Sequence, residues 1–401
     1  MSLYLERYAW QHELFPDYQP PDNLSMVVVI PCFKEPDIKG ALDSLNACKP
    51  PSNQILIIVI VNESEKATKE TKKETLNTLS QLERYNSNYS MLVSHQILPD
   101  KKAGVGLARK IGMDEAVRIL RKVGNDGAIV CYDADCRCDT NYLDEIELAY
   151  SIPETQSGIV FYEHQLHREN HQAIIDYELY LRYYIASLRH AKFPYAHQTL
   201  GSCITVRASM YEKVGGMNTR KAGEDFYFLN KTIPHGGFVE INSTTIRPSD
   251  RVSDRVPFGT GKAVNALLNS REVYEVYHPN TFEDLRLFFS KIDLFWNEED
   301  WKLPMTLSTF LGDDWKEKIN EIKNQVSSFE AFKKRFFHWF DAFKVLKFVH
   351  FCRDEFYQNV ELEEALDWLR TKHFFLKGSK ESYLVQLRYL DRNTKWNLAK
   401  M

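Results

Sequence analysis

The sequence predicts an α/β fold: a mostly parallel sheet with helices on both faces, followed by a helical accessory region. From residue 26 onward, short β-branched runs alternate with stretches of helical spacing, which is typical of right-handed βαβ crossovers. From about Lys262, strand-like runs fade and helical spacing dominates. A chain of 401 residues has room for one large α/β domain and an accessory domain, or for two to three average domains.

The first predicted strands are continuous apolar runs, which indicates burial on both faces of a sheet. Stretches with apolar residues at helical spacing separate them. The predicted strands lie at 26–30, 55–61, 91–97, 128–132, 158–162 and 200–207, and the predicted helices at 37–47, 66–84, about 105–122, 141–150, about 168–190 and from 224 onward.

These elements divide the chain into three predicted segments. Residues 1–25 are polar and aromatic with several prolines, and we expect them to form an arm on the main domain. Residues 26–261 form the α/β domain, and residues 262–401 the helical accessory domain. Within 26–261, we expect a polar, arginine-rich loop from Arg247 to Arg255.

The bulk composition is that of a soluble globular protein. It is 44% hydrophobic and 26% charged with a formal net charge of −4, so no basic excess indicates nucleic-acid binding. No apolar run approaches the roughly 18 residues that span a bilayer, and the amino terminus lacks an apolar signal segment. Seven scattered cysteines are expected to be reduced thiols, and Cys131, Cys136 and Cys138 lack the spacing of a zinc site. We therefore expect a cytoplasmic protein.

The strand at 128–132 ends in two carboxylates, Asp133 and Asp135. The i, i+2 spacing turns both the same way if the backbone stays extended, and hard oxygen ligands suit Mg²⁺ or Mn²⁺. A chain of this length contains about one Asp-x-Asp by chance, so the motif depends on its surroundings. Ligands of parallel sheets bind beyond the carboxyl ends of the strands, where residues 31–35 and 62–64 should join the two aspartates.

Five segments in order, VVVIPCFKEP, VNES, AGVGLARKIGMDEA, IVCYDADC and GGMNTRKAGEDFYFL, resemble an inverting family 2 glycosyltransferase of the GT-A fold. The resemblance covers about residues 26–229 and implies a Rossmann-like sheet, a nucleotide-sugar donor and a hydroxyl acceptor. By this resemblance, Asp133 and Asp135 hold a divalent metal against the donor diphosphate, and Ala134 lies on the donor side. Asp225 is the general base, and Glu224 positions the acceptor.

Simpler interpretations of these acids stay open. Asp133 and Asp135 are also compatible with a solvated strand end. Glu224 and Asp225 also favour a helix N-terminus electrostatically. A third metal ligand is not assigned, although His235 and His278 are candidates.

The resemblance also implies donor contacts. The donor-binding matches are Pro31, Phe33, Glu35, Asn62 and Arg109. Asn62 stands where the family commonly has an Asp against the base, so the choice between UDP- and GDP-linked donors stays open. Arg251 and Arg255 suit phosphates and are expected to close over the diphosphate, with Gly259 and Gly261 as hinges.

The chain lacks the Gln-x-x-Arg-Trp motif of processive family members, which favours transfer of single sugars. The aromatic and basic segment 332–356 is predicted to pack in a helical bundle, with peripheral membrane contact as the alternative. Two other functions stay open. A sugar-1-phosphate nucleotidyltransferase needs a glycine-rich loop where residues 31–35 stand, and a non-catalytic nucleotide-sugar-binding or assembly protein would bind donor without turnover.

Overall fold

The computed structural model describes residues 2–166, 171–221, 223–251, 265, 274–297, 302–373, 376–394 and 396. The chain divides into two compact units. The first comprises Met1–Ile174 and Thr199–Leu268, and the second Ile175–Gln198 and Asn269–Met401. Most of one helix, α6, therefore belongs to the second unit. The sequence did not suggest this, and the predicted boundary at 262 lies outside the described residues.

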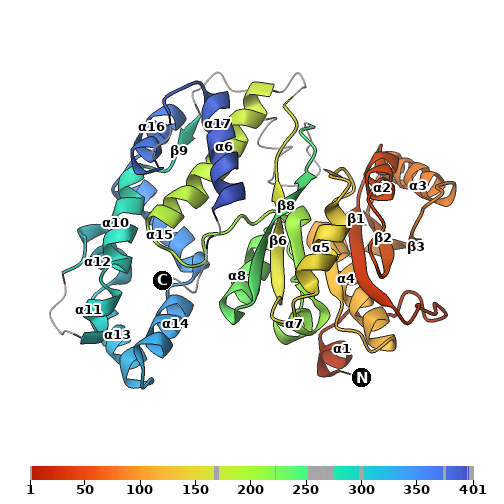
Figure 1. The fold of residues 1–401 in the computed structure, drawn as a ribbon, viewed down its shortest axis with the longest axis horizontal. Coiled ribbons are helices and arrows are strands. Elements are labelled where there is room, and N and C mark those ends of the chain that lie inside the picture. Colours follow the sequence, from red (N-terminus) through yellow and green to blue (C-terminus); the bar gives the residue numbers. More distant parts are fainter. Residues whose placement is uncertain are drawn as a thin grey trace. The chain divides into compact units, whose positions relative to one another are not determined.

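An eight-stranded sheet forms the centre of the first unit (Figure 1). Its strand order is β3 (Ser90–Leu98), β2 (Gln54–Ser64), β1 (Leu24–Cys32), β4 (Ala128–Cys131), β7 (Ile204–Arg207), β6 (Ser157–Tyr162), β8 (Phe238–Arg247) and β5 (Arg137–Cys138). Four of the seven pairings within this sheet are parallel: β1 with β2 and β4, β2 with β3, and β6 with β8. The α/β prediction is confirmed, with antiparallel pairings confined to β4–β7, β7–β6 and β8–β5.

The strands predicted from apolar runs are present because their side chains fill the core. Every residue of β1 except Ser25 is buried, and so is β2 from Ile55 to Glu63. Two predictions need correction. Residues 201–203, expected in a strand, form a 3₁₀ turn before β7. Arg247, expected to open a loop, ends β8, a strand whose mixed polar sequence shows no apolar run.

The helices of the first unit include the predicted segments. They are α1 (Leu3–Arg7), α2 (Ile38–Asn46), α3 (Lys69–Glu83), α4 (Val105–Lys122), α5 (Tyr142–Tyr150), α7 (Ala208–Lys213) and α8 (Glu224–Thr232), with a 3₁₀ turn at Ile233–His235. The two short helices, α1 and α7, were not predicted. Helix α4 is buried along nearly its whole length and packs on β1 and β2. At Gly112, a Cβ would overlap the side chain of Val29, so glycine permits the close approach of α4 to the sheet.

The N-terminal segment is held by two buried acids on α4. Asp114 accepts hydrogen bonds from the Tyr4 hydroxyl and the Trp10 backbone N–H, both at 2.6 Å. Glu115 accepts from the backbone N–H groups of Leu14 and Phe15 at 3.1 and 3.2 Å. Because buried carboxylates need hydrogen-bond donors, the segment 2–15 supplies the donors that Asp114 and Glu115 of α4 require.

The second unit is helical, apart from a two-residue antiparallel ladder of β9 (Glu275–Val276) and β10 (Val360–Glu361). Its described helices are α6 (His171–His190, from Ile175), α10 (Pro279–Phe289), α11 (Ile292–Asn297), α12 (Met305–Leu311), α13 (Trp315–Asn324), α14 (Phe329–Trp339), α15 (Ala342–Glu355), α16 (Leu362–His373) and α17 (Lys380–Asn393). No helix among the described residues is long and apolar enough to cross a bilayer.

The aromatic segment 332–356 forms two helices. Helix α14 ends at Trp339, and Asp341 caps α15 by accepting a 2.8 Å hydrogen bond from the Lys344 N–H. The rings facing inward are buried: Phe332, Phe336, Phe337, Phe340 and Phe348. This burial confirms that the segment packs in a helical core.

Candidate functional site

Three strand ends meet at one edge of the sheet. Val29 of β1 pairs with Ile58 of β2 and with Cys131 of β4, so the parallel strands run in register toward that edge. One expectation needs correction: Asn62 does not follow β2 but lies within it. Asn62 and Glu63 still pair with Gln96 and Ile97 of β3, and both are buried.

The segment after β4 is a turn rather than an extended strand end. The Cys136 N–H donates a 3.0 Å hydrogen bond to the Asp133 carbonyl and closes the turn. The extended geometry expected for Asp133 and Asp135 is therefore not present. Each carboxylate instead faces its own arginine: Asp133 faces Arg109, and Asp135 faces Arg251.

Arg109 joins two parts of the candidate site that lie far apart in sequence. Its Nη2 donates to Asp133 Oδ1 at 2.7 Å, and its Nη1 donates to Glu224 Oε1. The arginine is 1% exposed and Glu224 is 3% exposed. Burial lowers the pKa of Arg109, but the two carboxylates outweigh it and raise that pKa above its usual value. The guanidinium is therefore a fixed positive charge between the β4 turn and the start of α8.

Glycines leave room for this arrangement. A Cβ at Gly106 would overlap the carbonyl oxygen of Arg220 and lie 3.2 Å from the Glu224 Cβ. A Cβ at Gly201 would lie 2.7 Å from both terminal nitrogens of Arg109. Gly104 and Gly106 thus let Arg220, Lys221 and Glu224 approach the start of α4 closely.

Asp225 stands in the first turn of α8. Gly223, at φ 73°, supplies the left-handed residue before the helix, a conformation that glycine adopts without strain. Asp225 is half-buried, and its Oδ1 accepts a 2.7 Å hydrogen bond from the Phe226 N–H. Burial, and next the charge of Glu224, raise the pKa of Asp225 to about 7. A carboxylate with this pKa is suited to accept a proton near neutral pH.

On the donor side predicted from the sequence, Glu35 is 2% exposed and accepts from the Asp37 N–H at 2.9 Å. Arg251 donates to Glu35 Oε2 at 2.6 Å, and the same Nη2 lies 3.6 Å from Asp135 Oδ2. Arg251 thus links the turn after β1 to the turn after β4. Arg255, Gly259 and Gly261 lie outside the described residues.

The other predicted donor residues line the same turns. Pro31 is buried near the end of β1, Phe33 is half-buried, and Ala134 is 6% exposed between the two aspartates. Their donor contacts stay predictions, as does the donor contact of Arg109, whose terminal nitrogens face carboxylates.

A divalent cation suits the chemistry of the two aspartates. Their side chains keep 35% (Asp133) and 26% (Asp135) of their surface exposed, and both offer hard oxygens. Mg²⁺ usually takes one or two carboxylates and completes its shell with phosphate and water. Within the described part of the chain, no three His, Cys, Asp or Glu side chains form a ready-made metal site. His278 caps α10 in the second unit, accepting from the Asn280 N–H at 3.0 Å.

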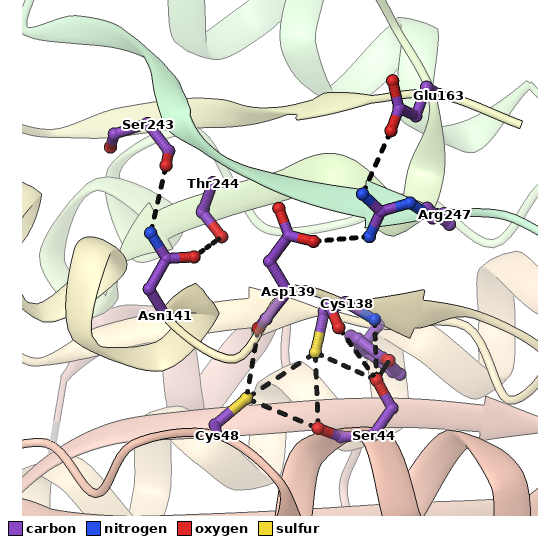
Figure 2. A network of polar contacts seen from close by, with 10 residues as sticks. Ser44, Cys48, Cys138, Asp139, Asn141, Glu163, Ser243, Thr244 and Arg247 are labelled. Atoms are coloured by element: carbon purple, nitrogen blue, oxygen red, sulfur yellow. Dashed lines mark hydrogen bonds and ion pairs between the residues drawn. The ribbon is translucent and has the colours of Figure 1, made fainter.

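A polar network joins β8 to β5 and to the residues that follow β5 (Figure 2). Arg247 of β8 donates to Asp139 at 2.6 Å and to Glu163 at 3.0 Å. Below it, the sulfurs of Cys48 and Cys138 lie 3.7 Å apart. The sequence singled out neither Asp139 nor Glu163 for this role, because their partner comes from a strand that it did not reveal.

Comparisons with known proteins find only distant likeness. A scan against protein-family models finds no match, and a search of curated proteins finds none either. Solved structures that match include S. aureus TarS 1–349 in complex with UDP-GlcNAc, with 15% identity, 69% of this chain and 76% of that chain covered, and a TM-score of 0.43.

Two more matching structures are similarly distant. GalNAc-T7 with UDP, GalNAc and Mn²⁺ has 14% identity, 77% and 56% coverage, and a TM-score of 0.37. The mannosyltransferase PcManGT from Pyrobaculum calidifontis with GDP-Man and Mn²⁺ has 13% identity, 94% and 88% coverage, and a TM-score of 0.38. Likeness at these scores carries no argument about activity, so the function is inferred from the site.

Proposed function

We propose that this protein is a metal-dependent inverting glycosyltransferase with a GT-A-type first unit. It transfers one sugar from a nucleotide-sugar donor, UDP- or GDP-linked, to a hydroxyl acceptor. One observation carries the proposal: Arg109 holds the aspartate turn after β4 against the Glu224–Asp225 turn of α8. A group for the leaving diphosphate and a base for the acceptor thus belong to one cluster.

On the acceptor side, Asp225 is the general base. It takes the proton of the acceptor hydroxyl as that oxygen attacks the anomeric carbon, and a single displacement inverts the configuration. A pKa of about 7 leaves a large fraction of Asp225 ionised at neutral pH. Within the described chain, its Oδ2 accepts no hydrogen bond, so the substrate hydroxyl meets no competing donor there.

On the donor side, Asp133 and Asp135 would hold the Mg²⁺ or Mn²⁺. When bound, the ion stabilises the negative charge that develops on the leaving nucleoside diphosphate. Arg251 adds a guanidinium beside Asp135. Phe33, half-buried after β1, offers a surface for the nucleoside, and the buried Pro31 and Asn62 shape the adjoining strand ends. Glu35 orients Arg251 through their 2.6 Å contact.

The test begins with thermal stability in a panel of UDP-, GDP- and dTDP-sugars, with and without Mn²⁺. A ligand stabilises the folded state according to its affinity, so the correct donor class raises the melting temperature. Sugar transfer or donor hydrolysis is then measured for the wild type, Asp133→Asn and Asp225→Asn. We expect both variants to lose about 10²–10⁴-fold in turnover.

Two outcomes would overturn the proposal. If no donor shifts the melting temperature and no nucleotide sugar is consumed, the site is not a glycosyltransferase site. If a donor binds tightly but neither hydrolysis nor transfer follows with a broad acceptor panel, the protein is a nucleotide-sugar-binding protein.

A further inference from the structure

We propose that Arg109 is a positioning residue that holds the donor-side Asp133 and the acceptor-side Glu224–Asp225 turn in one fixed arrangement. The inference rests on the proposed function and assigns Arg109 a role other than contact with the donor. It also makes Glu224 the anchor of α8, which leaves Asp225 as the acid directed at the acceptor.

The first support is the division of the guanidinium between two carboxylates. Nη2 donates to Asp133 and Nη1 to Glu224, so both terminal nitrogens already form hydrogen bonds within the protein. The arginine is almost fully buried, and such a charge is tolerated only when it is paired. A donor diphosphate would have to displace these carboxylates to reach it.

The second support is the backbone around the guanidinium. Gly201 leaves the space in which the terminal nitrogens lie, and Gly106 admits the Arg220 carbonyl and the Glu224 side chain. Three segments, α4, the 3₁₀ turn at 201–203 and the start of α8, are therefore shaped around one side chain. The Asn218 side chain adds a 3.1 Å hydrogen bond to the Glu224 carbonyl at the same helix start.

Arginine has the geometry for this role, and lysine does not. A planar guanidinium presents several N–H donors in a fixed fork and stays charged when buried. A lysine ammonium is a single point on a flexible stem, so it cannot keep both directions fixed. Because a displacement of about 1 Å can cost on the order of 100-fold in rate, Arg109→Lys should impair turnover even in a folded protein.

The experiment is a double-mutant cycle with Arg109→Lys, Glu224→Gln and the combined variant. Turnover at saturating donor and acceptor and the donor KM are measured at 20 °C with Mn²⁺. The melting temperature of each variant is measured separately. We expect Arg109→Lys to lower kcat about 10- to 100-fold. Adding Glu224→Gln should lower it little further, because both changes break the same linkage.

The second unit offers a matched control. Arg182 is also 1% exposed and also links two carboxylates, Glu178 at 2.8 Å and Asp391 at 2.5 Å. Arg182→Lys should lower the melting temperature comparably but keep kcat within about twofold, since the candidate site lies in the first unit. A loss of kcat that only reflects stability would appear in both variants.

The outcomes separate the two proposals. Any of four results would overturn the positioning role. Two concern Arg109→Lys itself: an unchanged kcat, or a raised donor KM alone. The others are multiplicative losses of kcat in the cycle, and a loss of kcat in Arg182→Lys equal to that in Arg109→Lys. Failure of the wild type to turn over any nucleotide sugar would overturn the proposed function instead. If Arg109→Lys does not fold, Glu224→Gln alone still tests the linkage, because it must lower kcat without raising the donor KM.

Discussion

At the scale of single residues, Asp225 determines how activity should depend on pH. Its pKa of about 7 lies above the ordinary 3.8 because burial and Glu224 disfavour the charged form. The base works only when deprotonated, so kcat/KM should rise with pH and reach half its plateau near pH 7. Initial rates from pH 5.5 to 8.5 at constant Mn²⁺ test this, and a flat profile would contradict it.

The same raised pKa predicts a stability effect. Protons bind more tightly to the folded state, so the stability that Asp225 contributes is fully present below pH 3.8 and is lost as pH rises through about 7. Asp225→Asn removes the buried charge and should stabilise the fold by roughly 1–2 kcal/mol at pH 8. The gain should shrink at pH 5.5, as measured by thermal melts, whereas an equal gain at both pH values would exclude this cause.

At the residue scale, the sequence identified the acidic candidate residues but not the residues with which they pair. Asp133, Asp135, Glu224 and Asp225 stand out because carboxylates at strand and helix ends form recognisable patterns. That Arg109 pairs with Glu224, 115 positions away, follows only from the packing of α4 against the start of α8. No local pattern carries that information.

At the scale of elements, Gly106 should control the placement of α8. Gly106→Ala forces a Cβ against the Arg220 carbonyl, and overpacking of this kind costs about 1–3 kcal/mol. We expect a lower free energy of unfolding in urea together with a loss of kcat. Gly112→Ala is the matched control, since its Cβ meets Val29 instead and should destabilise α4 without moving the Glu224–Asp225 turn. Equal kcat losses in the two variants would contradict this explanation.

The segment just after α2 and strand β5 carry a second testable feature, a pair of thiols. Cys48 and Cys138 have sulfurs 3.7 Å apart, and the hydrogen bond from Cys48 lowers the pKa of Cys138. Oxidised glutathione should therefore convert the pair to a disulfide, with two glutathione molecules as the reduced product. Mass spectrometry should find a 48–138 cross-link and none involving Cys203. Glutathione adducts without a cross-link would contradict the prediction.

Elements were predictable where the sheet is buried on both faces. Strands β1, β2 and β4 appear as apolar runs because neither face meets water, whereas β3 is largely half-exposed or exposed. Strand β8 escaped prediction because it mixes buried and half-exposed positions and contains Glu240, Asn242 and Ser243. The turn at 133–136 was not predicted. A hydrogen bond closes it, and sequence spacing alone cannot distinguish a closed turn from an extended strand end.

At the scale of the whole molecule, each of the two units has its own buried charge network. A change in the network of the second unit should therefore alter stability without altering activity. In the second unit, Glu178 is fully buried and accepts from Arg182 at 2.8 Å and from Arg388 at 2.7 Å. Arg182 in turn donates to Asp391 of α17 at 2.5 Å. These contacts tie α6 to α17 within that unit.

Glu178→Gln should therefore destabilise the protein strongly without changing the candidate site. Removing one partner of a buried ion pair leaves charges uncompensated and costs about 3–5 kcal/mol. All described candidate site residues belong to the first unit, so donor affinity measured by calorimetry at 20 °C should stay within about twofold of the wild type. Asp144→Asn, on α5 of the first unit, controls for the loss of one negative charge. A donor affinity that falls along with stability would mean that the second unit contributes to the donor site, and the assignment of that site to the first unit alone would then be wrong.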